Sequence, residues 1–514
     1  MTVGDTGAIT GSTVYAGAAP EVAGPAIARH EGRVAVVGSD RQVEEFALPL
    51  GIDPLKGAKG SIVPGFVDSH AHLAALGMNR TSIDLANARS IGDVLDLLQA
   101  RAVTSDDEVL LAHGLDESKM GEGRAPTTEE LDSAIPGRPI FINDRGLHYV
   151  VCSSACLAFL GIDPASNETG RFDEASAGEV RAALGSRMTI EQRRDFLRGA
   201  ATHMAEQGFT SVHAIEGGTL SDDRDIPILL GESSSLPISV CLYWNTTETA
   251  AVEEAGLSRM GGDIFVDGSL GARTALLSRP YADDPSTSGR QFLTEEEMAG
   301  LIRGAEKRGI QISFHAIGDR AIEIALAAFS AAAAGSALRH RIEHFGLAGP
   351  EQIDRARALG LIISTQPSFA YLRGGPGSVY ERRLGADRAA RAYGLRALAE
   401  SGVAVAAGTD APVTPPDPLL GIAACAGHPT ESERIDVETG LDWFTRGGAF
   451  AGGEEAERGL LEPGMIADLV LLDGDLHSIE ATEAGELGIE LTVSRGRIVA
   501  GRRAEAVGTA MTRR

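Results

Sequence analysis

Residues 61–72 read Ser61-Ile62-Val63-Pro64-Gly65-Phe66-Val67-Asp68-Ser69-His70-Ala71-His72, an apolar run that ends in two histidines separated by one residue. The run has the apolar character of a buried β-strand. Residues i and i+2 of a strand point to the same face, so both imidazoles can bind one metal ion. Borderline cations such as Zn²⁺ favour neutral imidazole together with carboxylate oxygen. Read alone, the pair also fits two ordinary loop histidines, so the choice between these and a metal-binding strand depends on the rest of the chain.

Strand-like apolar runs continue along the chain and alternate with helical stretches, such as 294–308 and 321–334. After the first strand come Phe209–Ala214, Pro237–Leu242, Asp263–Val266, Ile310–His315, Arg341–His344, Leu361–Thr365 and Val403–Ala407. Eight β/α units predict an α/β protein with a (β/α)₈ TIM barrel. We place this barrel at residues 63–458, with an inserted subdomain at about 73–194.

The sequence pattern at both ends of the chain differs from that of the middle. Residues 1–62 and 459–514 contain short strands separated by turns, and neither end could bury a sheet alone. Together they predict one small composite β-sandwich that brings the two ends of the chain side by side.

Composition limits the classes of partner. The chain has 514 residues, of which 43% are hydrophobic, and 72 acidic against 46 basic residues give a net charge of −26. Such a charge argues against nucleic acid or an anionic membrane as a partner and for a soluble, self-repelling surface. The expected partner is a small-molecule substrate. Four cysteines without paired spacing, and no apolar run long enough to span a membrane, favour a reduced, cytoplasmic protein. The sequence leaves open whether the chain forms a homo-oligomer.

The metal-competent side chains fall at one kind of position. His70 and His72 end the first strand, His315 ends the fifth, His344 ends the sixth, and Asp410 follows the eighth. In a TIM barrel the chemistry lies at the carboxyl ends of the strands. Five such side chains on one rim predict a metal centre there.

Six segments in this order resemble the amidohydrolase superfamily. The similarity is greatest to its amidohydrolase-3 branch, which includes YtcJ-like hydrolases and N-substituted formamide deformylases. The segments are 64–72 (PGFVDSHAH), 267–275 (DGSLGARTA), 315–319 (HAIGD), 341–344 (RIEH), 408–413 (GTDAPV) and 464–470 (GMIADLV).

The resemblance implies roles for the rim residues. His70, His72 and Asp410 would bind a first metal, Zn²⁺ or another divalent cation, and His315 and His344 would lie around a second. Asp410 would also take a proton from the metal-activated water and deliver it to the leaving nitrogen. The metal would lower the pKa of that water and polarise the substrate carbonyl.

One position departs from the branch, which commonly has a bridging, carbamylated lysine four residues before Asp-Gly-Ser. This chain has Asp263 there. Its oxygens lie three bonds from Cα rather than seven, and at about 1.25 Å per bond the side chain falls short by roughly 5 Å. Asp263 should therefore not bridge two metals unless the strand shifts, and we expect it to hydrogen-bond a ligand histidine instead, with an altered bridging position as the alternative. One metal per chain is favoured over two, with His344 freer to orient or protonate the substrate.

Two further residues are candidates for substrate binding. Arg273 lies in the loop after the fourth strand, where it could reach a substrate carboxylate, with a plain surface role as the alternative. His148 matches a histidine that the branch carries in the insertion. Ser153, however, stands where the branch usually has asparagine, so the family's substrate pocket is not fully preserved.

The sequence therefore predicts an enzyme, a metal-dependent amidohydrolase that cleaves an amide or N-substituted formamide C–N bond. One alternative is a mononuclear aminohydrolase, or deaminase, on the same fold, which would release ammonia. The other is a non-catalytic barrel that binds a small molecule, which would hold no metal even after exposure to zinc.

Overall fold

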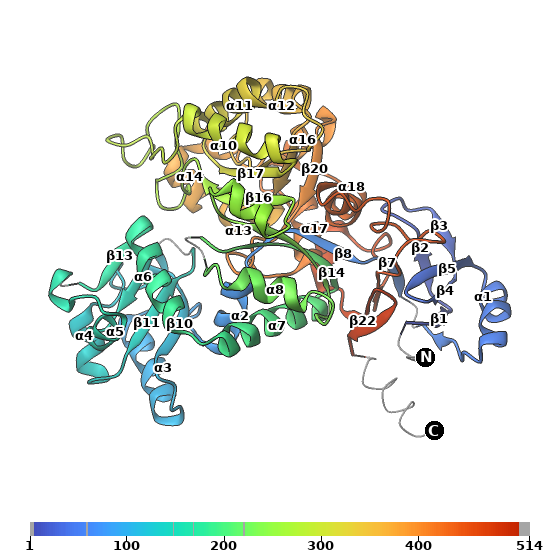
Figure 1. The fold of residues 1–514 in the computed structure, drawn as a ribbon, viewed down its shortest axis with the longest axis horizontal. Coiled ribbons are helices and arrows are strands. Elements are labelled where there is room, and N and C mark those ends of the chain that lie inside the picture. The colour runs from blue at the N-terminus through green and yellow to red at the C-terminus, as the bar shows by residue number, and fades with distance from the viewer. Residues whose placement is uncertain (1–4, 58–59, 147–148, 168, 219–220, 503–514) are drawn as a thin grey trace. The chain divides into compact units, whose positions relative to one another are not determined.

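The computed structural model describes residues 5–57, 60–146, 149–167, 169–218 and 221–502. The chain divides into two compact units (Figure 1). The first unit contains Met1–Ala71, Ala201–Ile215 and Gly231–Arg514, and the second contains His72–Ala200 and Glu216–Leu230. No helix among the described residues combines the length and apolar character needed to cross a membrane.

An almost closed barrel of eight parallel strands forms the centre of the fold, which confirms the predicted TIM barrel. Its strands follow chain order around the sheet, and an isolated parallel bridge between Ala71 and Ala411 joins the first strand to the segment that follows the last. The strands are β8 (Phe66–Ala71), β14 (Phe209–Glu216), β15 (Ser239–Trp244), β16 (Arg259–Phe265), β17 (Gln311–Ala316), β18 (Arg341–His344), β19 (Ile362–Thr365) and β20 (Ala404–Ala407).

Helices cover the outside of the barrel, so its strands are buried on both faces and read as continuous apolar runs. All eight residues of β14 and all six of β17 are buried. Helix α10 begins at a capping box, in which Thr294 and Glu297 satisfy each other's backbone N–H groups. The helices of this part are α9 (Thr249–Glu254), α10 (Glu295–Arg308), α11 (Asp319–Ala332), α12 (Pro350–Ala358), α13 (Pro367–Arg373), α14 (Val379–Leu384), α15 (Ala386–Ala389), α16 (Leu395–Ser401), α17 (Pro418–Ala426), α18 (Val437–Asp442) and α19 (Gly448–Ala451).

The two ends of the chain build two mixed sheets within the first unit. Strand β7 (Ser61–Pro64) pairs antiparallel with β21 (Leu469–Leu472), so that Ile62 lies opposite Leu471. Their shared core includes Ile9, Ile27, Ile62, Leu469 and Val493. The remaining elements are β1 (Gly7–Thr10), β2 (Thr13–Tyr15), β3 (Val22–Gly24), β4 (Ala26–His30), β5 (Arg33–Gly38), α1 (Asp40–Ala47), β6 (Leu55–Lys56), β22 (Ile489–Ser494) and β23 (Arg497–Ala500). In Figure 1 the blue and red ends of the chain come together here.

The second unit has its own five-stranded sheet, in the order β13-β12-β11-β10-β9, and its own core around Val94, Leu110 and Ile140. It begins at residue 72 and also takes in 216–230, whereas we expected an insertion at about 73–194. Its strands are β9 (Ile83–Asp84), β10 (Leu110–Leu115), β11 (Ile140–Asp144), β12 (Tyr149–Cys152) and β13 (Arg171–Asp173). Its helices include α2 (Leu73–Thr81), α3 (Ile91–Thr104), α4 (Thr128–Ala134), α5 (Ser154–Leu160) and α6 (Glu174–Arg187), and α7 (Ile190–Glu206) and α8 (Asp225–Glu232) extend into the first unit.

Strand β16 contains a wide bulge. Gly261 pairs with Ser313 and Phe265 pairs with His315, so four steps along β16 match only two along β17. The bulge bends the backbone at Gly261 (φ 84°) and Gly262 (φ 101°), values that favour glycine. A Cβ atom at Gly262 would lie 2.5 Å from Cδ1 of Ile215. The sequence therefore needs glycine at this point.

We expect Gly262→Ala to destabilise the protein by at least about 1–3 kcal/mol, because it adds both backbone strain and a steric clash. Thermal unfolding of the two proteins would show this as a lower midpoint. Gly300→Ala is the matched control, because Gly300 lies within helix α10 with open space around its would-be Cβ. That change should be neutral or stabilising. An unchanged midpoint for Gly262→Ala would contradict the strain argument.

Candidate metal centre

Four of the five predicted rim residues, together with Asp263, lie at the carboxyl ends of barrel strands in the first unit. His70 is in β8, Asp263 in β16, His315 in β17 and His344 at the end of β18, and Asp410 follows β20. All five are at most 6% exposed. His72 is also buried; it directly follows β8 and is the N-cap residue of α2, at the start of the second unit.

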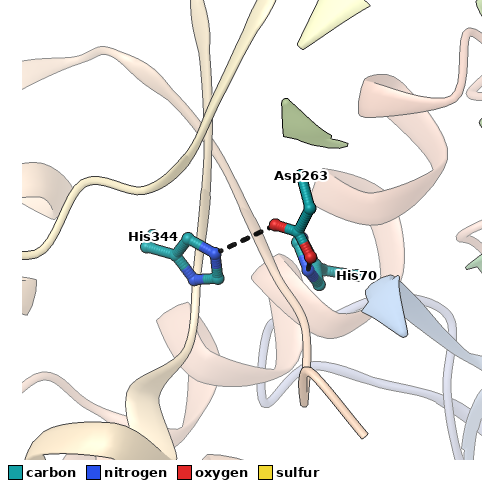
Figure 2. A group of neighbouring side chains, drawn as sticks. All are labelled: His70, Asp263 and His344. Atoms are coloured by element: carbon teal, nitrogen blue, oxygen red, sulfur yellow. Dashed lines mark ion pairs between the residues drawn. The ribbon is translucent and has the colours of Figure 1, made fainter. Parts of the chain in front are cut away.

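Asp263 lies between two histidines (Figure 2). Its Oδ2 atom is 3.6 Å from Nε2 of His70, and its Oδ1 atom is 3.5 Å from Nε2 of His344. Oδ1 of Asp410 is also 3.6 Å from Nε2 of His70. Two ligands that each lie about 2.1 Å from a tetrahedral cation are about 3.4 Å apart, whereas a direct hydrogen bond would bring them to about 2.9 Å. These separations therefore fit residues arranged around a cation.

Asp263 reaches the site, contrary to the expectation from its short side chain. The bulge at Gly261 and Gly262 directly precedes Asp263 and shifts the backbone. The estimate from bond lengths assumed a regular strand at this point. The Asp263 side chain is therefore long enough to reach the site, because each of its oxygens faces a histidine nitrogen.

Glu343 orients the imidazole of His70. Its Oε2 atom is 2.8 Å from Nδ1 of His70, so Nδ1–H donates to the carboxylate and Nε2 faces Asp263 and Asp410. A carboxylate in this position fixes the tautomer of a metal-binding histidine and raises its basicity. Burial alone would raise the pKa of Glu343, but Arg341 and His70 hold it well below its usual range.

His344 is held in a similar way by an amide. Its Nδ1 atom is 2.8 Å from Oε1 of Gln366, so Nδ1–H donates and Nε2 keeps its lone pair. That Nε2 atom has no hydrogen-bond partner among the described residues, although Asp263 lies at 3.5 Å. Burial and then the neighbouring His315 lower the pKa of His344, which favours the neutral imidazole that a cation binds.

His315 lies beside His344, with ring centroids 4.4 Å apart. Its Nδ1 atom is 3.5 Å from Oδ1 of Asp267. Asp267 also accepts hydrogen bonds from the backbone N–H groups of Leu276, Ile317 and Gly318 at 2.7–2.9 Å. This aspartate therefore ties together the loops that follow β16 and β17, next to the His315 imidazole.

The backbone is strained where the site residues leave their strands. His344 (φ 68°), Phe345 (φ 53°) and Asp410 (φ 55°) all have positive φ angles, which are costly for residues with a side chain. The N–H of Asp410 donates to the carbonyl oxygen of His70 at 2.7 Å and thereby fixes the Asp410 backbone against β8. Such strain is typical of functional sites.

The charge of the cluster also fits a cation. Burial lowers the pKa of the His70 imidazole, but the carboxylates of Asp263, Glu343 and Asp410 outweigh burial and raise that pKa to about 10. Without a metal, His70 would therefore hold a proton between carboxylates. A divalent cation would supply the same compensation, and imidazole with carboxylate is a suitable ligand set for Zn²⁺.

The two residues predicted for substrate binding have different outcomes. The Arg273 guanidinium donates to both oxygens of Asp283 at 3.1 Å, so the structure shows it in a partly exposed ion pair. Its role toward a substrate stays a prediction. His148 lies outside the described residues.

Sequence reasoning missed the roles of Glu343, Asp267 and Gln366. Glu343 was visible within the Arg-Ile-Glu-His segment, two residues after Arg341 and therefore on the same face of the strand. Its partner His70 lies 273 residues away in the chain, so only the assembled barrel shows the contact. Gln366 directly follows β19 and carries no comparable sequence signal.

We expect Glu343→Gln to weaken metal binding by about 10- to 100-fold, because an amide is a poorer acceptor for Nδ1–H of His70 than a carboxylate. Competition with a fluorescent chelator would measure the change. Glu306→Gln is the matched control, because Glu306 contacts Nε2 of a different histidine, His340, at 2.7 Å. Equal affinities for Glu343→Gln and the parent protein would contradict this role.

Comparison with known proteins gives consistent matches along the chain. The model of the amidohydrolase family matches residues 58–500. The putative amidohydrolase YtcJ of Bacillus subtilis is 29% identical, covering 85% of this chain and 88% of that protein. The N-substituted formamide deformylase of Arthrobacter pascens is 25% identical, covering 90% and 93%. A crystal structure of an uncharacterised metal-dependent hydrolase from Pyrococcus furiosus has a TM-score of 0.78 at 29% identity, covering 91% and 99%.

Proposed function

The chain belongs to the amidohydrolase family and is a hydrolase that acts on C–N bonds, and we propose that its substrate is a small amide or N-substituted formamide. The observation that carries this proposal is the buried carboxylate of Asp263 between His70 and His344, with Asp410 beside His70. The deformylase of Arthrobacter pascens supports the formamide class.

The proposed ligand set combines residues from several strand ends. His70, His72 and Asp410 would bind one divalent cation, for which Zn²⁺ suits the imidazole and carboxylate donors, and His315 and His344 would serve a second position. Such a cation would supply a water of lowered pKa and a polarised scissile carbonyl. His72 joins the set because it follows His70 by two residues.

Asp410 is the proposed general base. Its Oδ1 atom lies 3.6 Å from Nε2 of His70. In that place the carboxylate could accept a proton from the attacking water and later pass it to the leaving nitrogen. His344 keeps a lone pair on Nε2 because Gln366 accepts from its Nδ1–H. This favours a ligand role for His344 over protonation of the substrate.

A panel of N-alkyl and N-aryl formamides, with the matching acetamides, would test the proposal. Metal-loaded protein should release the amine and the acid in equal amounts, and the release should stop when a chelator removes the metal. His70→Ala serves as the control for contaminating hydrolases. Ammonia release from an aminated heterocycle, without hydrolysis of the amides, would favour the deaminase alternative. A protein that binds no metal and cleaves neither class would favour the non-catalytic alternative.

A further inference from the structure

The two oxygens of the Asp263 carboxylate face two different histidines (Figure 2). Oδ2 is 3.6 Å from Nε2 of His70, and Oδ1 is 3.5 Å from Nε2 of His344. We propose that Asp263 bridges two divalent cations, one shared with His70 and the other with His344. The inference rests on the metal centre of the proposed function and deepens it, because it replaces the single cation expected from the sequence with a pair.

The separations support one cation on each side of the carboxylate. Each oxygen–nitrogen distance is close to the value of about 3.4 Å expected for two ligands of one tetrahedral cation. Asp410 adds a second carboxylate on the His70 side, with Oδ1 at 3.6 Å from Nε2. On the other side, the His315 ring lies 4.4 Å from the His344 ring, centre to centre. Each half of the site therefore offers more than one candidate ligand.

The backbone of β16 provides the reach that the side chain lacks. Two positive-φ glycines, Gly261 and Gly262, directly precede Asp263, and the register with β17 shifts across them. A Cβ at Gly261 would lie 2.1 Å from the carbonyl oxygen of Ser313, and one at Gly262 would meet Ile215 at 2.5 Å. The close approach of this strand to its neighbours therefore depends on glycine, and it carries a short side chain into the centre.

No lysine on the barrel strands could serve in place of Asp263. The sequence has lysine only at positions 56, 59, 119 and 307, and none of these lies in β8 or in β14 to β20. A carboxylate offers a carbamate's two oxygens and single negative charge without a reaction with carbon dioxide. We therefore expect assembly of the metal pair to be independent of bicarbonate.

Metal analysis and electron paramagnetic resonance (EPR) test the bridge in the full-length protein. Metal-free protein would be titrated with Mn²⁺ in buffer purged of carbon dioxide, with and without added bicarbonate. We expect two bound Mn²⁺ ions per chain under both conditions. Their EPR spectrum should be that of an exchange-coupled pair, because a bridging carboxylate holds two metals about 3.5–4 Å apart.

Asp263→Asn keeps the shape of the side chain but removes its charge and one oxygen. We expect this variant to bind one Mn²⁺ per chain and to give the spectrum of an isolated ion. Asp468→Asn is the matched control, because Asp468 is a buried aspartate beside β21 that pairs with Arg458 at 2.8 Å. It should keep the coupled pair even if its unfolding midpoint falls.

One Mn²⁺ ion per parent chain, two uncoupled ions, or an unchanged coupled pair in Asp263→Asn would each overturn the inference. If Asp263→Asn does not fold, the number of bound Mn²⁺ ions and the EPR spectrum of the parent protein still test the bridge. A coupled pair in a protein that hydrolyses no amide would refute the proposed function and leave the bridge standing. Amide hydrolysis by a protein with a single bound ion would support the proposed function and refute the bridge.

Discussion

Replacing Asp410 with asparagine is expected to lower kcat by about 10²- to 10⁴-fold, the range typical for loss of a general base. Asparagine keeps the shape of the side chain, and the backbone N–H of residue 410 can still donate to the carbonyl oxygen of His70. What is lost is the oxygen that can carry a proton from water to the leaving nitrogen. Steady-state kinetics on the best substrate of the panel would measure the change.

Metal content must be measured in the same samples, because Oδ1 of Asp410 also lies 3.6 Å from Nε2 of His70 and is a proposed ligand. The prediction therefore concerns kcat per metal-loaded chain. Asp417→Asn is the matched control: it makes the same chemical change in the region after β20, where Asp417 caps α17 by accepting from the N–H of Leu420. Asparagine caps equally well, so this variant should keep parental activity. Activity within a few-fold of the parent for metal-loaded Asp410→Asn would remove Asp410 from the role of base.

The barrel could be predicted from the sequence because its strands are buried on both faces. Each of the eight expected runs overlaps a barrel strand, and the order along the sheet follows the chain. The rim position of the site residues followed from the same pattern, since the carboxyl ends of parallel strands share one edge. His70, Asp263 and His344 come from three strands far apart in the sequence, yet the structure brings their polar atoms within 3.6 Å of one another in pairs.

The position of Asp263 could not be predicted, because the lengths of aspartate and carbamylated lysine were compared as if both stood on a regular strand. Two adjacent glycines indicate freedom of the backbone, but not the direction in which a bulge will turn. That direction depends on contacts with Ile215 in β14 and Ser313 in β17. The same limit applies to Gln366, whose contact with His344 depends on how two strand ends meet.

Buried charge in the barrel interior is the other feature that the sequence did not reveal. Arg341 and Glu343 were read as part of a family segment, without a structural role. In the structure both side chains are fully buried, and Arg341 donates to both oxygens of Glu343 at 2.9 Å. Arg341 also donates to Tyr243 at 2.8 Å and to the carbonyl oxygen of Ser69 at 2.7 Å. The Glu343 carboxylate that orients His70 therefore depends on this arginine for its charge balance.

Arg341→Met is accordingly expected to destabilise the protein by about 3–5 kcal/mol, because it leaves the charge of Glu343 buried without its partner. Methionine has a similar length and no charge, so lost volume contributes little. Chemical unfolding of metal-free samples would measure the change without the added effect of metal binding. The double variant Arg341→Met/Glu343→Gln is the control, because it removes both charges and should recover part of the lost stability.

The pH dependence distinguishes an unpaired charge from a simple packing defect, because only the charge would make the stability loss of Arg341→Met change with pH. In the parent protein, Arg341 and His70 hold the pKa of Glu343 below its unfolded value, so the stabilisation is present above that unfolded value and is lost as pH falls. In Arg341→Met the carboxylate loses its main counter-charge while burial still opposes ionisation, so its pKa should rise. The stability difference between the two proteins should therefore shrink as pH falls toward about 4.3, the ordinary glutamate pKa. A difference that stays constant with pH would show that the loss comes from packing rather than from the unpaired charge of Glu343.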